Sequence, residues 1–283
     1  MSSSGQNLPG ADAPLGIIGG TGLETFPEIK PLRTIRPETP YGNPSDDLTI
    51  GILAGREVVF LPRHGARHTL PPSRIPYKAN LAAMKELGVT TVVATCIVGS
   101  LKREIEPGFF VVPDQFMNFT WGRDADGVEP DGSFLHLPMG DPYCQPLRQQ
   151  VSEVLRGAGV TVQEEGTVVV IQGPRFSTRA ESRFFSRNGW DIVNMTQYPE
   201  CVFARELGLC YAAMAAVTDW DVGIDSAFSM HPDTMDAVMN VFRGNTEKTR
   251  QTVASLAERL AGFACGCART RYVEYYKREA GEP

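Results

Sequence analysis

Residues 210–221 read CYAAMAAVTDWD, an apolar run that ends in two carboxylates, Asp219 and Asp221, on either side of a tryptophan. A short apolar run bounded by polar residues predicts a strand buried on both faces, here over residues 210–217. Ligands of open α/β sheets bind beyond the carboxyl ends of such strands. Because side chains two residues apart in extended chain point the same way, Asp219 and Asp221 can face one ligand. An isolated D-x-D is more often a solvated turn, so the rest of the chain decides between the two interpretations.

The flanking sequence alternates short apolar runs with amphipathic segments. The apolar runs predict strands over residues 15–18, 48–53, 57–61, 91–96, 109–113, 166–171 and 191–194, with a hairpin at Ala54-Gly55. Helical spacing of apolar residues predicts helices over 77–87, 146–157, 199–208 and 232–261. No repeat or linker divides the chain. We therefore expect an α/β fold, a single domain over residues 14–270 with a central mixed, mostly parallel β-sheet flanked by helices.

Composition and charge narrow the class of protein. Of 283 residues, 42% are hydrophobic and 21% charged, which is typical of a globular protein with ample core. The formal net charge of −6 argues against a nucleic-acid partner, because phosphate backbones attract a basic face. No apolar run approaches the ~20 residues that span a bilayer, so we expect no membrane partner. Residues 1–13 lack the features of a signal peptide and predict a disordered leader, residues 271–283 predict a charged tail, and the expected location is cytoplasmic.

The six cysteines follow no metal-binding pattern along the chain. They are Cys96, Cys144, Cys201, Cys210, Cys265 and Cys267. Most lie in apolar runs, as buried free thiols do. Because their spacing matches no zinc-ligand pattern and histidine is scarce, we assign no metal. Cys265-Gly266-Cys267 could close a small strained disulfide, although two reduced thiols are favoured in the cytosol.

Two polar turns after predicted strands could converge on one anion. The first, GGTG at 19–22, lets backbone N–H groups approach an oxyanion closely, and Thr21 adds a hydroxyl donor. The second, PRHG at 62–65, offers the bidentate fork of Arg63 and a further donor in His64. The glycine turn is neither a dinucleotide fingerprint nor a Walker loop, because the third glycine and the Lys-Ser or Lys-Thr pair are missing. Either turn alone is a weak signal.

Several segments, in this order and spacing, resemble the S-methyl-5′-thioadenosine phosphorylases of the trimeric purine nucleoside phosphorylase family. The resemblance rests on GIIGGTGLE at 16–24, PRHG at 62–65, HTLPPSRIPYKAN at 68–80, VGSL at 98–101, GPRFSTRAES at 173–182, NMTQYPE at 194–200 and TDWD at 218–221. It runs from residue 15 to about residue 250. It implies the nucleoside phosphorylase fold and a pentosyltransferase that splits 5′-methylthioadenosine with phosphate into adenine and 5-methylthioribose 1-phosphate. Inorganic phosphate is then the co-substrate, with no cofactor and no metal.

The resemblance also implies which residues hold the phosphate. They are Thr21, Arg63, His64, Cys96, Ile97 and Thr196. Ile97 would contribute only its backbone N–H. Cys96 departs from the family pattern, which has a threonine hydroxyl there. A thiol is a weak donor, and one neutral hydrogen bond contributes ~0.5–1.5 kcal/mol, so we expect looser phosphate binding.

At the other end of the implied site, the two carboxylates recognise the purine. Asp219 is placed to assist the leaving base at N7, and desolvation would raise its pKa so that it can act as a donor. Asp221 would accept from the 6-amino group, which disfavours a 6-oxo purine. Phe176 and Ser177 are implied at the base and Met195 at the ribose, although without the motif a methionine at a strand end is more often a core residue.

The 5′ end of the nucleoside is implied to meet apolar side chains. Met235 takes the position of a histidine that binds the 5′-hydroxyl in ordinary purine nucleoside phosphorylases, and Val238 follows one turn on. The loop before them carries a three-residue insertion, with His231 nearby, so the alignment there stays open. His136 matches a residue that closes the 5′ pocket of the adjacent subunit, which implies a homotrimer with shared active sites. Two alternatives remain: a methylthioinosine or broad-specificity purine nucleoside phosphorylase, and a non-catalytic nucleoside-binding protein.

Overall fold

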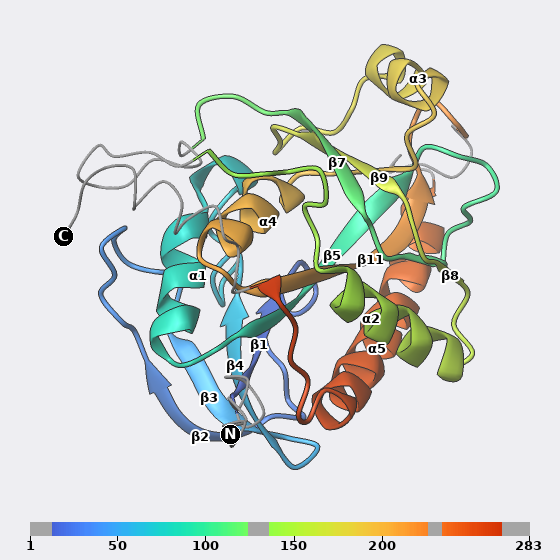
Figure 1. Cartoon of the computed structure of the whole chain (residues 1–283). Helices are drawn as coiled ribbons and strands as arrows, with labels where there is room; N and C mark the ends of the chain where they lie inside the picture. Colours follow the sequence, from blue (N-terminus) through green and yellow to red (C-terminus); the bar gives the residue numbers. More distant parts are fainter. Residues whose placement is uncertain (1–12, 124–135, 226–233, 268–283) are drawn as a thin grey trace, which may run out of the picture.

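The computed structural model describes residues 13–123, 136–225 and 234–267, and Figure 1 shows the whole chain. The predictions of a disordered leader over 1–13 and a charged tail over 271–283 fall outside these ranges, apart from Ala13. Within the described ranges, no helix is long and apolar enough to cross a membrane.

A mixed β-sheet occupies the centre of the molecule (Figure 1). Its strands follow the order β2-β3-β4-β1-β5-β10-β9-β7, with β11 paired to β5 and β6, and β8 paired to β6. Six of the ten strand pairs are parallel, so the predicted mixed, mostly parallel sheet is confirmed. The strands are β1 (Leu15–Gly19), β2 (Lys30–Ile35), β3 (Leu48–Leu53), β4 (Arg56–Pro62), β5 (Thr91–Ser100), β6 (Phe110–Val111), β7 (Gln115–Phe119), β8 (Val162–Gln163), β9 (Thr167–Ile171), β10 (Ile192–Asn194) and β11 (Cys210–Trp220).

Helices cover β11 on both faces, which explains its nearly continuous apolar sequence. The helices are α1 (Tyr77–Glu86), α2 (Gln145–Gly157), α3 (Arg179–Arg187), α4 (Gln197–Glu206) and α5 (Met235–Arg259), with the short 3-10 helix η1 (Pro72–Arg74) before α1. Ala212 and Met214 pack into the apolar cluster of α2 and α5, whereas Tyr211 and Ala213 pack into that of α1 and α4. Because side chains alternate between the two faces of the sheet, β11 contributes to both apolar clusters.

Two predicted strands are longer than their apolar runs. Strand β5 continues past Cys96 to Ser100, and β11 past Val217 to Trp220, because the two strands stay paired through Trp220 and Ser100. The pairing shifts register between Val217 and Asp219. Such a bulge re-aims side chains, and bulges are common beside active sites.

Other differences follow from elements that carry no burial pattern. Strand β2 was not predicted because all of its residues are exposed. Strand β7 is not among the strands predicted above, and its last three residues are exposed. Helix α3 is not among the helices predicted above; its N-cap is Thr178, which forms a capping box with Glu181. The hairpin at Ala54-Gly55 is confirmed, and both residues have positive φ, as a two-residue hairpin turn requires.

Candidate active site

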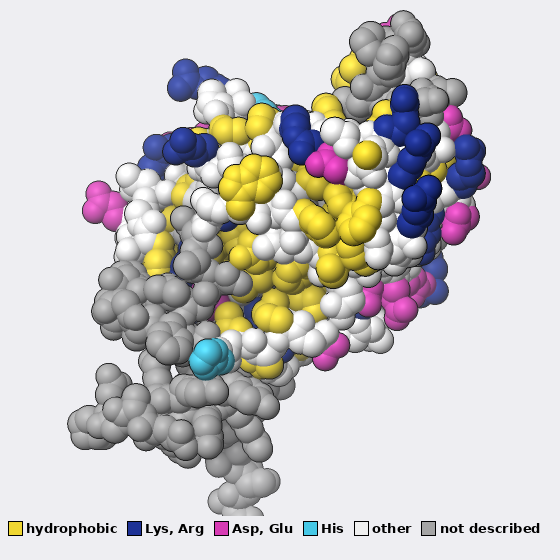
Figure 2. Space-filling model, turned by 90° about the horizontal axis from the view of Figure 1, so that it is seen from above, with side chains coloured by type: hydrophobic (Ala, Val, Ile, Leu, Met, Phe, Trp, Pro, Cys, Tyr) yellow, Lys and Arg dark blue, Asp and Glu magenta, His cyan; other side chains and the backbone are white. Residues whose placement is uncertain are grey.

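A cavity of about 340 Å³ opens where β1, β4, β5, β10 and β11 end or pass, a size typical of small-molecule sites. Eleven of the residues predicted from the sequence line it. They are Thr21, Arg63, His64, Cys96, Ile97, Phe176, Ser177, Met195, Thr196, Asp219 and Asp221. Hydrophobic side chains gather across the middle of the face seen from above, with Lys and Arg side chains toward its upper left and right edges (Figure 2). Six separated loop tips and strand ends thus meet around one space.

Arg63 is held at one end of this cavity by an acid that is distant in sequence. Its Nε and Nη2 atoms donate to the two carboxylate oxygens of Glu200 at 2.6 and 2.8 Å, and both side chains are 1% exposed. Nη1 donates to the carbonyl of Thr95 at 2.8 Å. Burial acts to lower the pKa of Arg63, but the Glu200 carboxylate outweighs it and holds that pKa above its usual range. Since a guanidinium has five N–H groups, one remains on each terminal nitrogen for an anion.

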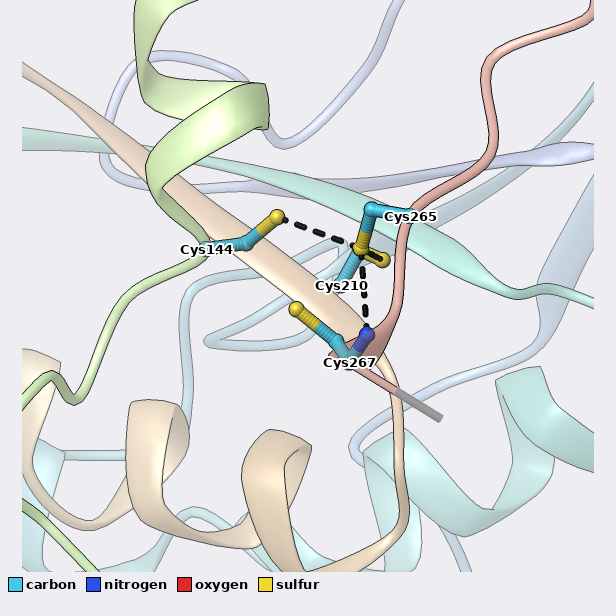
Figure 3. Close-up of side chains that lie close together, drawn as sticks. All are labelled: Cys144, Cys210, Cys265 and Cys267. Carbon is cyan, nitrogen blue, oxygen red and sulfur yellow. Dashed lines mark hydrogen bonds between the residues drawn. The ribbon is translucent and has the colours of Figure 1, made fainter. Parts of the chain in front are cut away.

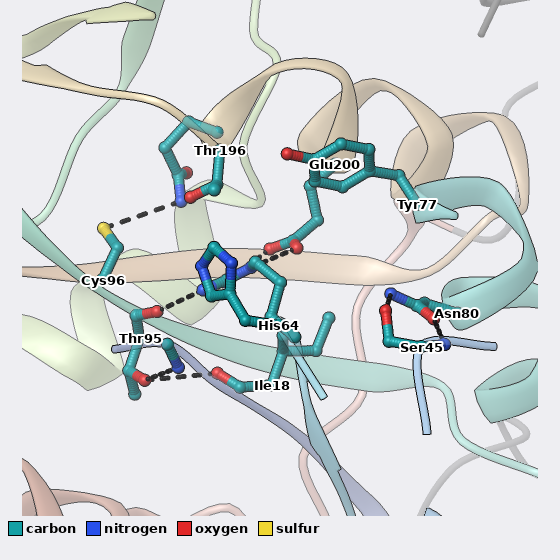
Figure 4. A network of polar contacts seen from close by, with 12 residues as sticks. Ile18, Ser45, His64, Tyr77, Asn80, Thr95, Cys96, Thr196 and Glu200 are labelled. Carbon is teal, nitrogen blue, oxygen red and sulfur yellow. Dashed lines mark hydrogen bonds and ion pairs between the residues drawn. The ribbon is translucent and has the colours of Figure 1, made fainter. Parts of the chain in front are cut away.

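The glycine turn after β1 comes close to the same arginine. A Cβ on Gly20 would lie 2.5 Å from the carbonyl oxygen of Thr95 and 2.9 Å from Nη1 of Arg63, so only glycine fits. The N–H of Gly20 donates to the Thr95 hydroxyl, which donates in turn to the carbonyl of Ile18 (Figure 4). Thr95 thereby ties β1, β5 and Arg63 together behind the cavity wall.

The imidazole of His64 presents a single nitrogen to the cavity. Its Nδ1 lies 2.9 Å from the carbonyl oxygen of Leu70, and since a carbonyl can only accept, Nδ1 carries the hydrogen. Burial lowers the pKa of His64 to about 4, so the ring is neutral at pH 7. Nε2 is then an acceptor, whereas the sequence suggested a second donor. The ring stacks on His68 at a centroid distance of 4.5 Å, and Nδ1 of His68 lies 2.8 Å from Glu24.

Cys96 is a neutral thiol in a polar corner of the cavity. Its Sγ accepts from the side-chain amides of Asn194 and Gln197 at 3.6 and 3.8 Å (Figure 4 shows the corner). Burial raises the pKa of the thiol to about 11. With the sulfur already accepting two hydrogen bonds, its S–H is the group left to meet a ligand, and it is a weak donor.

The two carboxyl groups Asp219 and Asp221 form the opposite end. Both are 7% exposed. Burial raises the pKa of Asp219 to about 7, and the neighbouring carboxylate of Asp221 raises it further. The hydroxyl of Thr218 opposes this shift by donating to Oδ1 at 2.7 Å. Burial also raises the pKa of Asp221, against the effects of the Ser182 and Ser177 hydroxyls. Oδ2 of Asp221 and the hydroxyl of Ser177 are buried and make no hydrogen bond of ordinary geometry, although Ser177 lies close enough to Asp221 to lower its pKa. A ligand that satisfies these atoms needs donor and acceptor groups side by side.

The walls between the two ends are apolar. Phe176 lines the cavity with 58% of its surface exposed, and Met195 is half-buried beside Gly173. An exposed aromatic face at the rim suits a flat heterocycle.

Three predicted residues lie outside the lining. Met235 starts α5 half-buried and Val238 is 2% exposed on the same helix, so their predicted contact with the 5′ substituent stays a prediction. His136 is exposed, and its predicted role concerns a neighbouring subunit. His231 falls outside the described residues.

Sequence reasoning missed several members of the site. Glu200 carried one signal, a lone acid among apolar residues at 199–204, but nothing pointed to its partner Arg63. Asn194 also orients the turn, because its Oδ1 accepts from the backbone N–H groups of Thr196 and Gln197. The remaining lining residues not predicted are His68, Pro72, Val98, Gly99, Ile171, Pro174, Val193 and Thr218.

Comparison with known proteins places the chain in a family. The profile of the phosphorylase superfamily matches residues 14–261. The S-methyl-5′-thioadenosine phosphorylase of Nitrosopumilus maritimus is 42% identical over 259 residues, 91% of this chain and 96% of that protein. The purine nucleoside phosphorylase of Streptomyces coelicolor is 43% identical over 245 residues, 84% of this chain and 86% of that protein.

Solved structures agree with the sequence matches. Methylthioadenosine phosphorylase from Schistosoma mansoni in complex with adenine has a TM-score of 0.84 at 36% identity, and the match covers 94% of this chain and 96% of that one. A mutant of that enzyme in complex with methylthioadenosine has a TM-score of 0.82. The predicted nucleoside phosphorylase fold is confirmed. The chain therefore belongs to the phosphorylase superfamily, as a relative of its methylthioadenosine and purine nucleoside phosphorylases.

Proposed function

We propose that the protein catalyses the phosphorolysis of 5′-methylthioadenosine. A phosphate oxygen attacks C1′ of the ribose with inversion, and the C1′–N9 bond breaks through an oxocarbenium-like transition state. The electron pair of that bond passes to the purine, which takes a proton at N7. The products are adenine and 5-methylthioribose 1-phosphate, and phosphate is the only co-substrate.

The observation that carries this proposal is the pair of buried carboxyl groups at the base end. Because the pKa of Asp219 is about 7, a large share of this carboxyl is protonated at neutral pH and can donate to N7 as charge develops there. The unpartnered Oδ2 of Asp221 supplies an acceptor for the 6-amino group of adenine. A 6-oxo purine would set an acceptor against an acceptor, which costs roughly 1–3 kcal/mol.

Support for the phosphate comes from the opposite end. The two remaining N–H groups of Arg63 and the hydroxyls of Thr21 and Thr196 are donors that line the cavity. Neutral His64 offers Nε2 as an acceptor, and HPO₄²⁻ has one O–H to give. The arrangement fits a dianion that is positioned below the ribose and keeps its oxygens free to attack.

A second candidate is a purine nucleoside phosphorylase of other or broader specificity, including methylthioinosine. The similarity to the purine nucleoside phosphorylase of Streptomyces coelicolor supports this second candidate. Phosphate-dependent release of base from methylthioadenosine, methylthioinosine, adenosine and inosine, followed by chromatography, separates the two. We expect the highest kcat/KM with methylthioadenosine. A higher value with inosine would reject the proposed specificity, and release without phosphate dependence would reject phosphorolysis.

We also propose that the enzyme is a homotrimer whose contact includes the exposed edge strand β7. Met117 and Phe119 on β7 are 38% and 37% exposed, and Trp121 and Phe184 nearby are 67% and 52% exposed. Large exposed apolar patches mark interaction sites. Trp121 exchanges backbone hydrogen bonds with the side chain of Gln172, directly before the cavity segment 173–177, so a subunit docked here would adjoin the site.

Light scattering on two matched variants tests this contact. We expect a trimer for the unmodified protein and dissociation for Phe184→Glu. Leu32→Glu on the other exposed edge, β2, is the control, since Leu32 is 63% exposed and outside the patch. A monomeric unmodified protein, or dissociation of the Leu32 variant alone, would contradict the proposal.

We propose the cytoplasm as the location. All six cysteines are free, whereas oxidising compartments pair cysteines into disulfides.

A further inference from the structure

Four of the six cysteines meet outside the cavity. The sulfur atoms of Cys144, Cys210, Cys265 and Cys267 all lie within 4.8 Å of one another (Figure 3). Cys144 precedes α2, Cys210 opens β11, and the other two follow α5. Cys144 and Cys210 are buried, at 4% and 5% exposure, while Cys265 and Cys267 are half-buried.

This cluster could not be recognised from the sequence, from which we assigned no metal. Spacing along the chain showed no zinc pattern because the four thiols come from three segments that only the fold brings together. The N–H of Cys144 donates to the carbonyl of Tyr211, which follows Cys210, and this contact fixes the first two ligands relative to each other. The hydrophobic core under α2 and α5 holds Cys265 and Cys267 against them.

We propose that these four cysteines bind a single zinc ion in a closed, structural Cys₄ site. Zn–S bonds of about 2.3 Å in a tetrahedron place the sulfurs about 3.8 Å apart. The Sγ atoms of Cys144 and Cys265 are already 3.5 Å apart, and those of Cys210 and Cys265 are 2.6 Å apart. Side-chain rotations that move the sulfur atoms by about an ångström are enough to reach the tetrahedral S–S spacing.

The donor set selects the kind of metal. Four thiolates are soft ligands, which favour zinc, copper(I) or iron–sulfur centres over magnesium or calcium. In a four-iron cluster each cysteine sulfur binds a different iron atom, so the sulfurs lie far apart. Here all four sulfur atoms lie within 4.8 Å of one another, which is close enough to bind a single ion. Four protein ligands also leave no open position for substrate, as in structural zinc sites.

The backbone around the cluster is compatible with a metal-bound sulfur. Cys144 is the N-cap residue of α2, and no side-chain hydrogen bond caps that helix terminus. The backbone N–H of Cys267 donates to Sγ of Cys265 at 3.3 Å, an interaction that supports a sulfur carrying negative charge.

The position predicts a role in stability and not in the reaction. Cys210 and Asp219 lie nine residues apart on β11, so at about 3.3 Å per residue the zinc site is roughly 30 Å from the base end of the cavity. A zinc ion here would fasten the segment after α5 to the start of β11 and the start of α2. Phe263, which packs on the same core, lies within that segment.

Metal content and cobalt substitution test the proposal on the full-length protein, expressed and purified under reducing conditions. We expect one equivalent of zinc per chain by elemental analysis. Replacement of zinc by Co²⁺ should give the intense visible bands of tetrahedral cobalt and thiolate-to-cobalt charge transfer. Removal of zinc should lower the melting temperature and leave kcat/KM of the remaining folded enzyme within twofold.

Two cysteine variants separate this cluster from the other thiols. Cys267→Ser should lose most of the zinc and the charge-transfer band, while Cys201→Ala, a buried thiol outside the cluster, should keep both. Reduced wild-type protein that neither contains nor takes up zinc would overturn the proposal, and it needs no variant to fold. Disulfides among the four cysteines in protein kept under reducing conditions, or equal zinc in both variants, would overturn it as well.

Discussion

Arg63 and Glu200 are 137 residues apart in sequence and form a two-pronged ion pair in which each side chain is 1% exposed. The phenol of Tyr211 donates a third hydrogen bond to Glu200 at 2.7 Å. A buried pair of this kind fixes the plane of the guanidinium, so its remaining N–H groups point in one direction. It also leaves this end of the cavity without a large net positive charge, because the carboxylate balances the arginine.

Glu200→Ala should destabilise the protein and weaken phosphate binding. Removing one partner leaves a buried charge uncompensated, which costs about 3–5 kcal/mol in the free energy of unfolding. The matched control is Glu164→Ala, which breaks the exposed pair with Arg156 and should cost at most about 1 kcal/mol. Urea titration checks both variants.

If Glu200→Ala does not fold, Glu200→Gln keeps the shape and removes the charge. We expect this variant to raise the KM for phosphate more than the KM for the nucleoside. Equal changes in both constants, or equal stability losses for the Glu200 and Glu164 variants, would show that the pair does not position Arg63.

The pKa of Asp219 predicts a pH dependence of activity. Only the protonated carboxyl donates to N7, so kcat/KM should fall as pH rises through about 7. Asp219→Asn should lower kcat by about 10²–10⁴-fold and abolish this alkaline limb. Steady-state rates measured from about pH 5 to about pH 9 check this pH dependence. An unchanged alkaline limb in the variant would contradict the role of Asp219.

The same pKa makes a separate prediction for stability. The folded state holds a proton on Asp219 between pH 3.8 and about 7, where the unfolded chain has released it. Stability from this group is therefore complete below pH 3.8 and is lost as pH rises through 7. Asp219→Asn should match the wild type near pH 4 and exceed it at pH 8 by on the order of a few kcal/mol. Parallel stability curves would show that the carboxyl is not buried as described.

Asp221 should determine the choice between amino and oxo purines. Asp221→Asn exchanges an acceptor oxygen for an amide that can donate to a 6-oxo group. We expect the ratio of kcat/KM for adenosine to that for inosine to fall about 10- to 100-fold. Because both nucleosides share the ribose, the ratio controls for general damage to the site. An unchanged ratio would mean that Oδ2 of Asp221 does not face the 6-position.

The strands and one side of the site could be predicted because burial leaves a mark in the sequence. The apolar runs of β1, β5 and β11 are fully buried, and the polar residues that follow them reach the same cavity because strand ends meet at one edge of a sheet. Strand β2 is exposed along its whole length, so its sequence contains no apolar run. Its strand depends on hydrogen bonds to β3, which no periodicity reveals.

Side-chain partners across the fold could not be predicted for a related reason. No sequence pattern near Glu200 predicts its contact with Arg63, and none near Cys144 predicts its contact with Cys265. Each contact joins segments more than 100 residues apart, so only the packed arrangement of strands and helices determines it. The low pKa of His64 was missed likewise, because it comes from burial and from neighbours that the chain supplies at a distance.

Met235 should set the preference for the 5′ substituent, although it lies outside the described cavity lining. A methylthio group placed against an apolar side chain gains about 0.8 kcal/mol per buried methylene-sized group, which a hydroxyl does not. We expect Met235→His to lower the ratio of kcat/KM for methylthioadenosine to that for adenosine several-fold. Equal ratios in variant and wild type would place another residue at the 5′ end.

Cys96→Thr should tighten phosphate binding. The threonine oxygen can accept from the amides of Asn194 and Gln197 as Sγ does now, and its hydroxyl is a stronger donor than a thiol. A gain of about 0.5–1.5 kcal/mol corresponds to a fall of roughly 2- to 10-fold in the KM for phosphate. Cys201→Thr is the control, because Cys201 is buried in α4 and does not line the cavity. Since β5 favours β-branched residues, the fold should tolerate the change, and a large loss of activity would then show that the thiol itself takes part in the reaction.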